Sequence, residues 1–284
     1  MADQGSVLIT GASSGIGAAC AVGLAKRGYS VFAGVRRPED GDRLKGEANE
    51  GLVPLLLDVT RPETIDTTRK TLEAAVGDRG LRCLFNNAGI SVNGPLEFVP
   101  LDDLRRQLEV NVVGQVAVTQ AFLPLLRQAK GRIITTGSVG GFVTTPILGP
   151  YCMSKYAMEA FSDALRIELK PQGIEVILPE PAAIATEIWD KGTQEAQAYE
   201  ENPPPGFLER YGAFFEGVKK FAAEGKQRAH PPRVVLDAVV HALESPKPKT
   251  RYVMGDGAGQ RKLLRRLPDR LRDRLILKAL GVRA

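Results

Sequence analysis

The sequence has few of the residues that build metal or disulfide sites. It contains three cysteines, Cys20, Cys83 and Cys152, without Cys-x-x-Cys or zinc-like spacing, and two isolated histidines, His230 and His241. A sparse, odd set of cysteines argues against a disulfide framework and suits a reducing compartment. Two separated histidines are too few for a zinc or iron site, so no metal is predicted.

Long apolar segments are also missing. No continuous run of about 18 apolar residues occurs, and residues 1–5 lead directly into a predicted strand, which leaves no room for a signal peptide. Apolar residues make up 43% of the chain and charged residues 25%, as in ordinary globular proteins. We therefore expect a folded, cytoplasmic protein.

Basic charge is confined to the C-terminus. The net charge is +5, but residues 261–283 hold nine Lys/Arg against two Asp, and the rest of the chain has 29 basic and 31 acidic residues. This distribution argues against a nucleic-acid-binding surface spread over a domain. Leu264, Leu267, Leu271 and Leu275 recur at steps of three and four, which predicts an amphipathic helix. It could lie on an anionic membrane, although packing on its own domain or on a second copy is preferred.

Short apolar or β-branched runs alternate with longer amphipathic stretches up to residue 178. Helix-like stretches are predicted near 15–27, 39–49, 62–77, 101–127 and 152–170, and strands at 6–10, 30–35, 52–57, 81–86, 132–137 and 174–178. Strands separated by helices imply right-handed crossovers. The predicted fold class is therefore α/β, with a doubly wound parallel sheet of the Rossmann type.

This alternation ends after residue 178. Residues 186–229 show no strand signal and carry seven of the 17 aromatic residues, namely Trp189, Tyr199, Phe207, Tyr211, Phe214, Phe215 and Phe221. A helix at 232–243 and a possible seventh strand at 251–254 follow. We predict one domain over residues 1–258, in which 186–229 is a helical substrate-loop insertion, and a basic amphipathic tail over residues 259–284.

A glycine-rich turn joins the first predicted strand to the first predicted helix. Glycine permits a tight turn and lets a phosphate approach the backbone, while the N–H groups at the start of the helix point at that phosphate. Its position between strand and helix predicts a dinucleotide site. The predicted cofactor-binding residues of the turn are Gly11, Ser13, Ser14, Gly15, Ile16 and Gly17.

Two arginines, Arg36 and Arg37, follow the second predicted strand. NAD-binding chains usually place an acidic residue here, about 20 residues past the glycine turn. An acidic side chain would repel a 2′-phosphate, whereas arginine can bind that phosphate through two hydrogen bonds. We therefore predict NADP(H) in preference to NAD. The alternative is that both arginines are solvated surface charges.

Tyr151 and Lys155 are four residues apart in a predicted helix, so their side chains share one face. A nearby ammonium favours the phenolate and lowers a tyrosine pKa from about 10 toward neutrality. Ser138 follows the fifth predicted strand and could donate a hydrogen bond to a carbonyl in the same cleft. Asn111 is a polar residue in an apolar helical context, for which a helix kink or a satisfied buried amide is the structural alternative.

Together these segments resemble the short-chain dehydrogenase/reductase family. Residues 10–17 match its Thr-Gly-x-x-x-Gly-x-Gly turn, residues 86–89 its Asn-Asn-Ala-Gly segment, and the Asn, Ser, Tyr and Lys of its catalytic tetrad occur in family order. The resemblance covers residues 6–189. It implies an oxidoreductase in which Ser138 polarises a carbonyl and Tyr151 exchanges a proton with it. Lys155 would hold the nicotinamide ribose and lower the tyrosine pKa, and Asn111 would position a water.

The resemblance also implies further cofactor contacts. These are Asp58 and Val59 beside the adenine, Asn87, Ala88 and Gly89 after the fourth strand, and Pro181, Ile184 and Thr186 on the nicotinamide side. One residue departs from the family pattern, because Ala182 stands where a glycine usually follows Pro181. Alanine resists torsions that glycine adopts, so we expect an altered nicotinamide-side loop.

Residues 77–81, 151–156 and 159–163 resemble the retinol and hydroxysteroid dehydrogenase branch of the family. That branch implies a bulky, apolar small-molecule alcohol or carbonyl substrate, and we expect a homodimer or homotetramer. The aromatic residues of the insertion suit an apolar pocket, or alternatively cover the core of their own domain. A 3-oxoacyl thioester reductase shares the same motifs. A nucleotide-sensing protein without turnover would be expected to lose Tyr151 or Lys155, and both are present.

Overall fold

The computed structural model describes residues 4–48, 50–187, 199 and 201–282. Its centre is a seven-stranded sheet with the order β3-β2-β1-β4-β5-β6-β7, in which every neighbouring pair of strands is parallel. The strands are β1 (Ser6–Ile9), β2 (Ser30–Val35), β3 (Leu52–Leu56), β4 (Cys83–Asn86), β5 (Arg132–Thr135), β6 (Glu175–Pro181) and β7 (Arg251–Met254). The predicted α/β fold with a doubly wound parallel sheet is confirmed.

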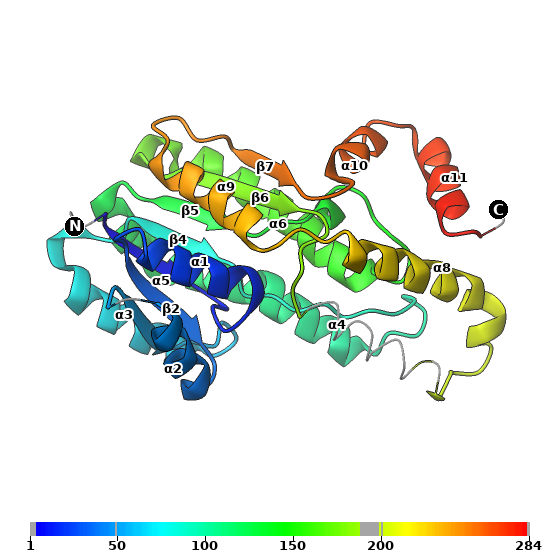
Figure 1. Ribbon diagram of the computed structural model, residues 1–284, viewed down its shortest axis with the longest axis horizontal. Coiled ribbons are helices and arrows are strands. Elements are labelled where there is room, and N and C mark those ends of the chain that lie inside the picture. Colours follow the sequence, from blue (N-terminus) through cyan, green and yellow to red (C-terminus); the bar gives the residue numbers. More distant parts are fainter. Residues whose placement is uncertain (1–3, 49, 188–198, 200, 283–284) are drawn as a thin grey trace.

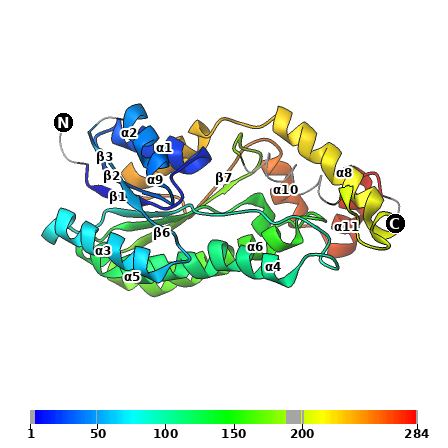
Figure 2. The same ribbon diagram turned by 90° about the horizontal axis from the view of Figure 1, so that it is seen from below.

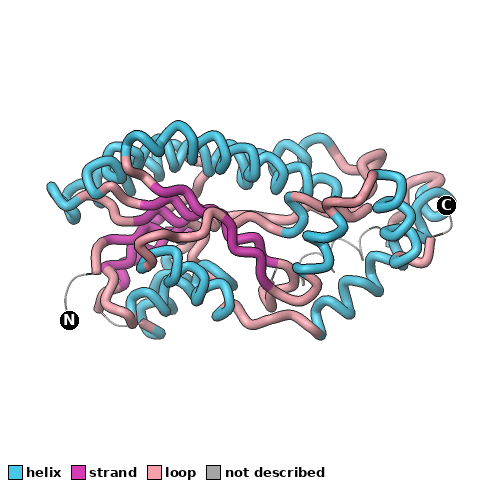
Figure 3. The backbone as a smooth tube through the Cα atoms, turned by 90° about the horizontal axis from the view of Figure 1, so that it is seen from above, coloured by secondary structure: helices cyan, strands magenta, loops and turns pink. Residues whose placement is uncertain are grey.

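Helices cover both faces of the sheet (Figures 2 and 3). One face carries α1 (Gly15–Ala25), α2 (Pro38–Glu47) and α9 (Arg233–Glu244), and the other carries α3 (Pro62–Val76), α5 (Gly114–Ala129) and α6 (Gly149–Leu169). Strand β1 shows why the sheet is buried on both sides. Val7 and Ile9 belong to the core cluster of α1 and α9, whereas Leu8 belongs to that of α3 and α5. Alternate residues of a strand face opposite sides, so an unbroken apolar run fills both cores.

Strand β6 extends three residues beyond its predicted end at 178. The prolines at 179 and 181 disfavour a strand at these positions, because proline donates no backbone hydrogen bond. In the structure the N–H of Leu178 donates to the carbonyl oxygen of Thr250, just before β7, and the N–H of Ala182 donates to that of Met254 at the end of β7. The two prolines alternate with these donors, so the N–H groups that face β7 keep their hydrogen bonds.

The helix predicted at 101–127 is interrupted. It consists of α4 (Leu101–Leu108), a π-helical turn (Glu109–Val113) and α5. By length and composition alone the combined segment Leu101–Ala129 could cross a membrane. However, Val118, Phe122 and Leu126 are completely buried in the core beneath the sheet. The segment therefore acts here as a core helix of the α/β fold.

The last helices lie with α4 beyond the carboxyl ends of the strands (Figure 1). They are α8 (Phe207–Gln227), α10 (Ala258–Leu264) and α11 (Asp269–Ala279). The prediction of a single amphipathic helix in the tail is wrong. The helix is interrupted between Leu264 and Asp269, because Pro268 cannot continue a helix. Leu271 and Leu275 remain 45% and 40% exposed, and it is Leu280 that packs against α8.

Candidate active site

A cavity of about 1420 Å³ opens at the carboxyl ends of the strands. Its floor is formed by the glycine turn, the residues that follow β2 to β6, and the start of α6, and the opposite wall comes from α8, α10 and α11. The order of the sheet reverses between β1 and β4, and ligands of open α/β sheets bind at such a switch point. The volume exceeds the roughly 300–1,000 Å³ of a pocket for one small molecule. It can therefore hold two ligands side by side.

The glycine turn leaves the start of α1 open to a ligand. Gly11 and Gly15 have φ angles of +62° and +55°, which favour glycine. A Cβ on Gly11 would lie 2.7 Å from the Cα of Ala88. The side chain of Ser14 makes no capping hydrogen bond to the described residues of α1, so the first N–H groups of the helix can receive a phosphate.

The predicted residues of the turn have two different roles. Those that line the cavity are Gly11, Ser13, Ser14, Gly15 and Ile16. Gly17 is buried and does not belong to the described cavity wall. A Cβ there would lie 2.2 Å from the carbonyl oxygen of Gly11, so Gly17 allows α1 to pack closely on the turn.

The two arginines after β2 are not equivalent. Arg36 is exposed and lines the cavity. Arg37 forms an ion pair with Asp40 at 3.2 Å and is not among the described wall residues. A third arginine, Arg43 on α2, donates a hydrogen bond to the carbonyl oxygen of Ser13. Sequence reasoning missed Arg43, because its contact with the glycine turn spans 30 residues and has no local signal.

The ends of β3 and β4 complete the dinucleotide side of the cavity. Asp58 and Val59 line it, and Oδ1 of Asp58 accepts hydrogen bonds from the backbone N–H and the hydroxyl of Thr60 at 3.0 and 2.8 Å. Asn87 donates to the carbonyl oxygens of Thr10 and Gly11 at 3.2 and 3.1 Å. These bonds fix β4 to the glycine turn. Ala88 and Gly89 line the cavity beside Asn87.

The four residues of the predicted tetrad line this same cavity. Ser138 follows β5 and accepts a hydrogen bond from the backbone N–H of Gly140 at 3.0 Å, while its side chain also hydrogen-bonds to the phenol of Tyr151. Tyr151 lies in the first turn of α6. One turn later, Nζ of Lys155 donates to the carbonyl oxygen of Thr136 at 2.7 Å and lies 5.7 Å from the centre of the tyrosine ring.

Burial sets the protonation of this pair. Burial raises the pKa of Tyr151 to about 12, and the hydrogen bond with Ser138 opposes that rise only in part. Burial also lowers the pKa of Lys155 to about 8. The expected lowering of the tyrosine pKa by Lys155 is not found, because desolvation dominates and the ammonium is directed to Thr136. At neutral pH the phenol therefore carries its proton and can donate it.

Asn111 occupies the π-helical turn, a distortion that is frequent at functional sites. Its side chain accepts from the N–H of Ile90 at 2.8 Å and donates to the carbonyl oxygen of Ile90 and to Oγ of Ser154, both at 3.0 Å. Gln107 adds hydrogen bonds to the same two acceptors at 3.0 and 3.2 Å. Ser154 Oγ donates in turn to the carbonyl oxygen of Tyr151 at 2.7 Å. Asn111 is thus a satisfied buried amide that braces the catalytic helix.

Sequence reasoning missed Gln107 and Ser154. A weak signal existed, since Gln107 precedes Asn111 by four residues and Ser154 precedes Lys155 directly. Residues four apart share a helix face, so two amides at this spacing predict a polar contact on an otherwise apolar segment. Their partner, the backbone of Ile90, could not be found by spacing.

The end of β6 brings Pro181 into the cavity wall, and the loop that follows brings Ile184 and Thr186. The altered nicotinamide-side loop expected from Ala182 stays a prediction. The backbone at Ala182 is not strained, because the non-glycine residues with positive φ in the described chain are Lys130 and Ile147. The N–H of Ala182 donates to the carbonyl oxygen of Met254 at 2.8 Å, which continues the ladder between β6 and β7. The alanine therefore fits this loop without strain.

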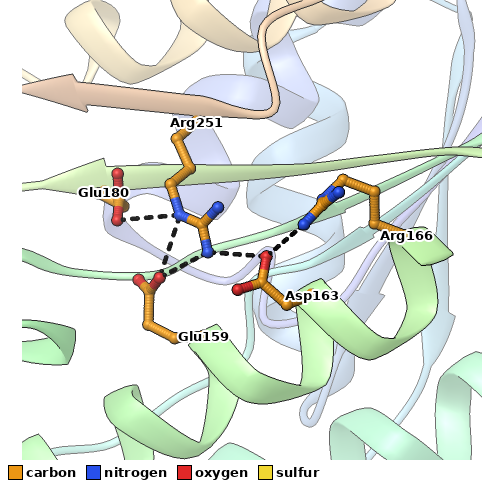
Figure 4. A network of polar contacts seen from close by, with 5 residues as sticks. All are labelled: Glu159, Asp163, Arg166, Glu180 and Arg251. Atoms are coloured by element: carbon orange, nitrogen blue, oxygen red, sulfur yellow. Dashed lines mark hydrogen bonds and ion pairs between the residues drawn. The ribbon is translucent and has the colours of Figure 1, made fainter.

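A partly buried charge network lies between the catalytic helix and strands β6 and β7 (Figure 4). Arg251 of β7 contacts Glu159 at 3.0 Å, Asp163 at 2.9 Å and Glu180 at 3.6 Å. Glu159 follows Lys155 by one helical turn, so the network ties α6 to β6 and β7. Burial and the neighbouring Glu159 raise the pKa of Glu180 to about 8. The oxygens of Glu180 make no hydrogen bond to the described residues.

Comparison with known proteins agrees with this geometry. Residues 6–197 match the short chain dehydrogenase family. The chain belongs to this family. The short-chain dehydrogenase described here is 36% identical to an NADPH-dependent 3-dehydrocapnine reductase from Ornithobacterium rhinotracheale, over 96% of each chain.

Two further proteins resemble this chain, one in its branch of the family and one in its fold. Retinol dehydrogenase 5 of Mus musculus is 35% identical over 89% of this chain and 81% of its own length, which confirms the predicted resemblance to the retinol dehydrogenase-like branch. A short chain dehydrogenase from Burkholderia cenocepacia J2315, solved in complex with NADP, superposes with a TM-score of 0.72. It is 26% identical, and the match covers 96% of this chain and 98% of that one. The chain is thus an oxidoreductase of the short-chain dehydrogenase family.

Proposed function

We propose that this short-chain dehydrogenase uses NADP(H) to interconvert a carbonyl compound and an alcohol, and that its substrate is bulky and largely apolar. One observation carries the proposal. Ser138, Tyr151 and Lys155 line the same cavity as the open N-terminus of α1, so a proton donor and a dinucleotide-binding turn face one space. The NADPH-dependent relative and the NADP-bound relative support the choice of cofactor.

The chemistry assigned to the protein's own residues is proton transfer and alignment. Ser138 would donate a hydrogen bond to the carbonyl oxygen, and Tyr151 would donate its proton to that oxygen as the alcohol forms. In the reverse direction the phenolate would remove the hydroxyl proton. Lys155, protonated below its pKa of about 8, would stabilise the phenolate as it forms. When bound, the nicotinamide supplies or accepts the hydride.

The far wall of the cavity supports an apolar substrate. It contains Val218 and Phe221 of α8, Leu264 of α10, and Ile276 and Leu280 beyond it. The aromatic residues of the insertion divide between the two predicted roles. Tyr199, Phe215 and Phe221 line the cavity, and Tyr199 and Phe215 also pack in one cluster with Phe98, Phe207, Tyr211 and Phe214. Trp189 lies outside the described residues.

The test is NADPH oxidation with a panel of alkyl and aryl ketones and aldehydes, measured for the wild type and for Tyr151→Phe. General acid catalysis contributes about 10²–10⁴-fold, so the variant should lose at least 100-fold in kcat while its NADPH affinity changes little. Ser138→Ala serves as the companion variant. Turnover that survives intact in Tyr151→Phe would contradict the mechanism. Turnover restricted to small polar 3-oxoacyl thioesters would contradict the apolar substrate.

A further inference from the structure

An arginine lies among apolar residues in the wall of the substrate side of the cavity, a wall that also carries Lys219, Lys226 and Arg228. Arg261 lies on α10 and lines the cavity together with Thr145, Cys152, Phe221 and Leu264. Its Nη1 donates to Oγ1 of Thr145 at 3.4 Å, and its guanidinium lies 5.3 Å from the centre of the Phe221 ring. Thr145 precedes the first turn of α6, and Cys152 adjoins Tyr151. The guanidinium is therefore close to the catalytic end of the cavity.

No carboxylate of the described residues pairs with Arg261. The acidic residues of the described cavity wall are Asp58, Glu109, Glu187, Glu224 and Asp256, and none of them forms an ion pair with Arg261 within 4.0 Å. Two arginines near this end of the molecule are paired, Arg251 with three acids and Arg210 with Glu97, whereas Arg228 and Arg265, like Arg261, form no ion pair with the described residues. Burial also lowers the pKa of Arg261, which shows that its cation is poorly solvated.

A poorly solvated cation without an anionic partner is costly in a folded protein. Its neighbours here are one hydroxyl and the face of one aromatic ring, neither of which carries negative charge. The guanidinium therefore retains donors without a hydrogen-bond partner among the described residues, and Arg261 lines the space that the substrate would fill. An anionic group would supply the missing partner through charge-assisted hydrogen bonds, for which the planar arginine side chain is well suited.

We propose that Arg261 binds an anionic head group of the substrate, so that the preferred substrate is an apolar chain or ring system carrying both the reacting carbonyl and an oxyanion. This inference rests on the proposed function and narrows its substrate class. The shared chemistry is that of a carboxylate, a sulfonate or a phosphate monoester. The apolar wall of α8 and α11 accommodates the remainder of the molecule.

Binding tests the inference without requiring turnover. Decanoate, decanesulfonate, decyl phosphate and the neutral isostere decanamide are titrated calorimetrically into the NADP⁺-loaded protein. A charge-assisted contact predicts that at least one of the anions binds about tenfold to a hundredfold more tightly than the amide. The three anions distinguish among the possible head groups. Equal binding of the amide and of all three anions would overturn the proposal.

Substitutions of Arg261 test whether the preference for anions depends on its side chain. Arg261→Gln should bring the anion-to-amide ratio of Kd values close to one, and Arg261→Lys should restore part of the preference. The matched control is Arg265→Gln, one turn further on, since Arg265 lines a separate cavity beside Phe142 and should not affect the ratio. An anion preference that persists in Arg261→Gln, or that disappears in Arg265→Gln instead, would refute the assignment.

Turnover separates this inference from the proposed function. The ratio of kcat/KM values for 10-oxoundecanoate and for its primary amide should favour the acid in the wild type and approach one in Arg261→Gln. If both compounds are reduced equally well by the wild type, the role of Arg261 fails while the oxidoreductase function stands. If neither is reduced and no other carbonyl compound is, the proposed function itself fails.

Discussion

The choice between NADPH and NADH should depend on one of the two adjacent arginines. Arg36 lines the cavity and forms no ion pair with the described residues, whereas Arg37 is held by Asp40 at 3.2 Å. Replacing Arg36 by alanine removes a cation that can face the 2′-phosphate of NADPH. Replacing Arg37 removes a cation that already has a partner on the helix that follows it, α2.

The expected magnitude follows from the kind of contact. A hydrogen bond to a charged group contributes about 1.5–3 kcal/mol, and about 1.4 kcal/mol corresponds to a factor of ten. Because Arg36 is exposed to solvent, its contribution should lie toward the lower end of that range. We expect Arg36→Ala to lower kcat/KM for NADPH by about tenfold to thirtyfold. NADH has no 2′-phosphate, so its kcat/KM should change by less than about twofold.

The assay is steady-state oxidation of both coenzymes at a fixed, saturating ketone concentration. Arg37→Ala is the matched control and should leave the NADPH-to-NADH ratio within about threefold of the wild type. Equal losses with both coenzymes in Arg36→Ala would show that Arg36 acts on the fold rather than on the phosphate. A large loss of NADPH preference in Arg37→Ala would refute the assignment.

Three further predictions concern stability and close packing. Lys155→Met should raise the Tm of the cofactor-free protein at pH 7. Burial holds the lysine pKa at about 8, so its charge opposes folding fully below pH 8, by on the order of 3 kcal/mol, and ceases to do so near pH 10.5. Thermal unfolding that shows the same gain at pH 7 and pH 10.5 would contradict this. Glu180→Gln should stabilise the protein more at pH 9 than at pH 5. A carboxyl with a raised pKa of about 8 opposes folding increasingly as the pH rises from 4.5 to 8. The reverse order of Tm differences would show that the Arg251 contact dominates. Gly17→Ala should abolish NADPH binding or folding, since the new Cβ would lie 2.2 Å from the carbonyl oxygen of Gly11. The control is Gly46→Ala in α2, where a Cβ would have no atom within 4 Å and should stabilise the helix by about 0.5–1 kcal/mol. Dinucleotide binding that survives in Gly17→Ala would disprove the packing argument.

The order of the strands and helices could be predicted from the sequence because it depends on local patterns. Strand β2, for example, is an apolar, β-branched run that ends where Arg36 begins, and both ends lie where the sequence places them. The tail also carried a local signal, since Pro268 interrupts the leucine spacing and predicts the observed break. Spacing alone could not reveal which apolar residues face α8, because Leu280 rather than Leu271 meets the aromatic cluster.

The site could be predicted in its chemistry but not in its surroundings. The glycine turn and the tetrad are sequence motifs, and their residues surround one cavity, apart from Gly17. By contrast, the π-helical turn at Asn111 depends on hydrogen bonds to the backbone of Ile90, which lies 21 residues earlier. Arg251 meets Glu159 across 92 residues, and Arg261 meets Thr145 across 116. Contacts of this kind arise from the packing of whole elements and have no local pattern.

The most direct test is a crystal structure with NADP⁺ and a ketone or alcohol inhibitor at saturating concentration. The account predicts the pyrophosphate at the start of α1, the nicotinamide beside Tyr151, and the inhibitor oxygen within hydrogen-bonding distance of both Tyr151 and Ser138. A dinucleotide bound elsewhere, or a tyrosine hydroxyl directed away from the inhibitor oxygen, would contradict it.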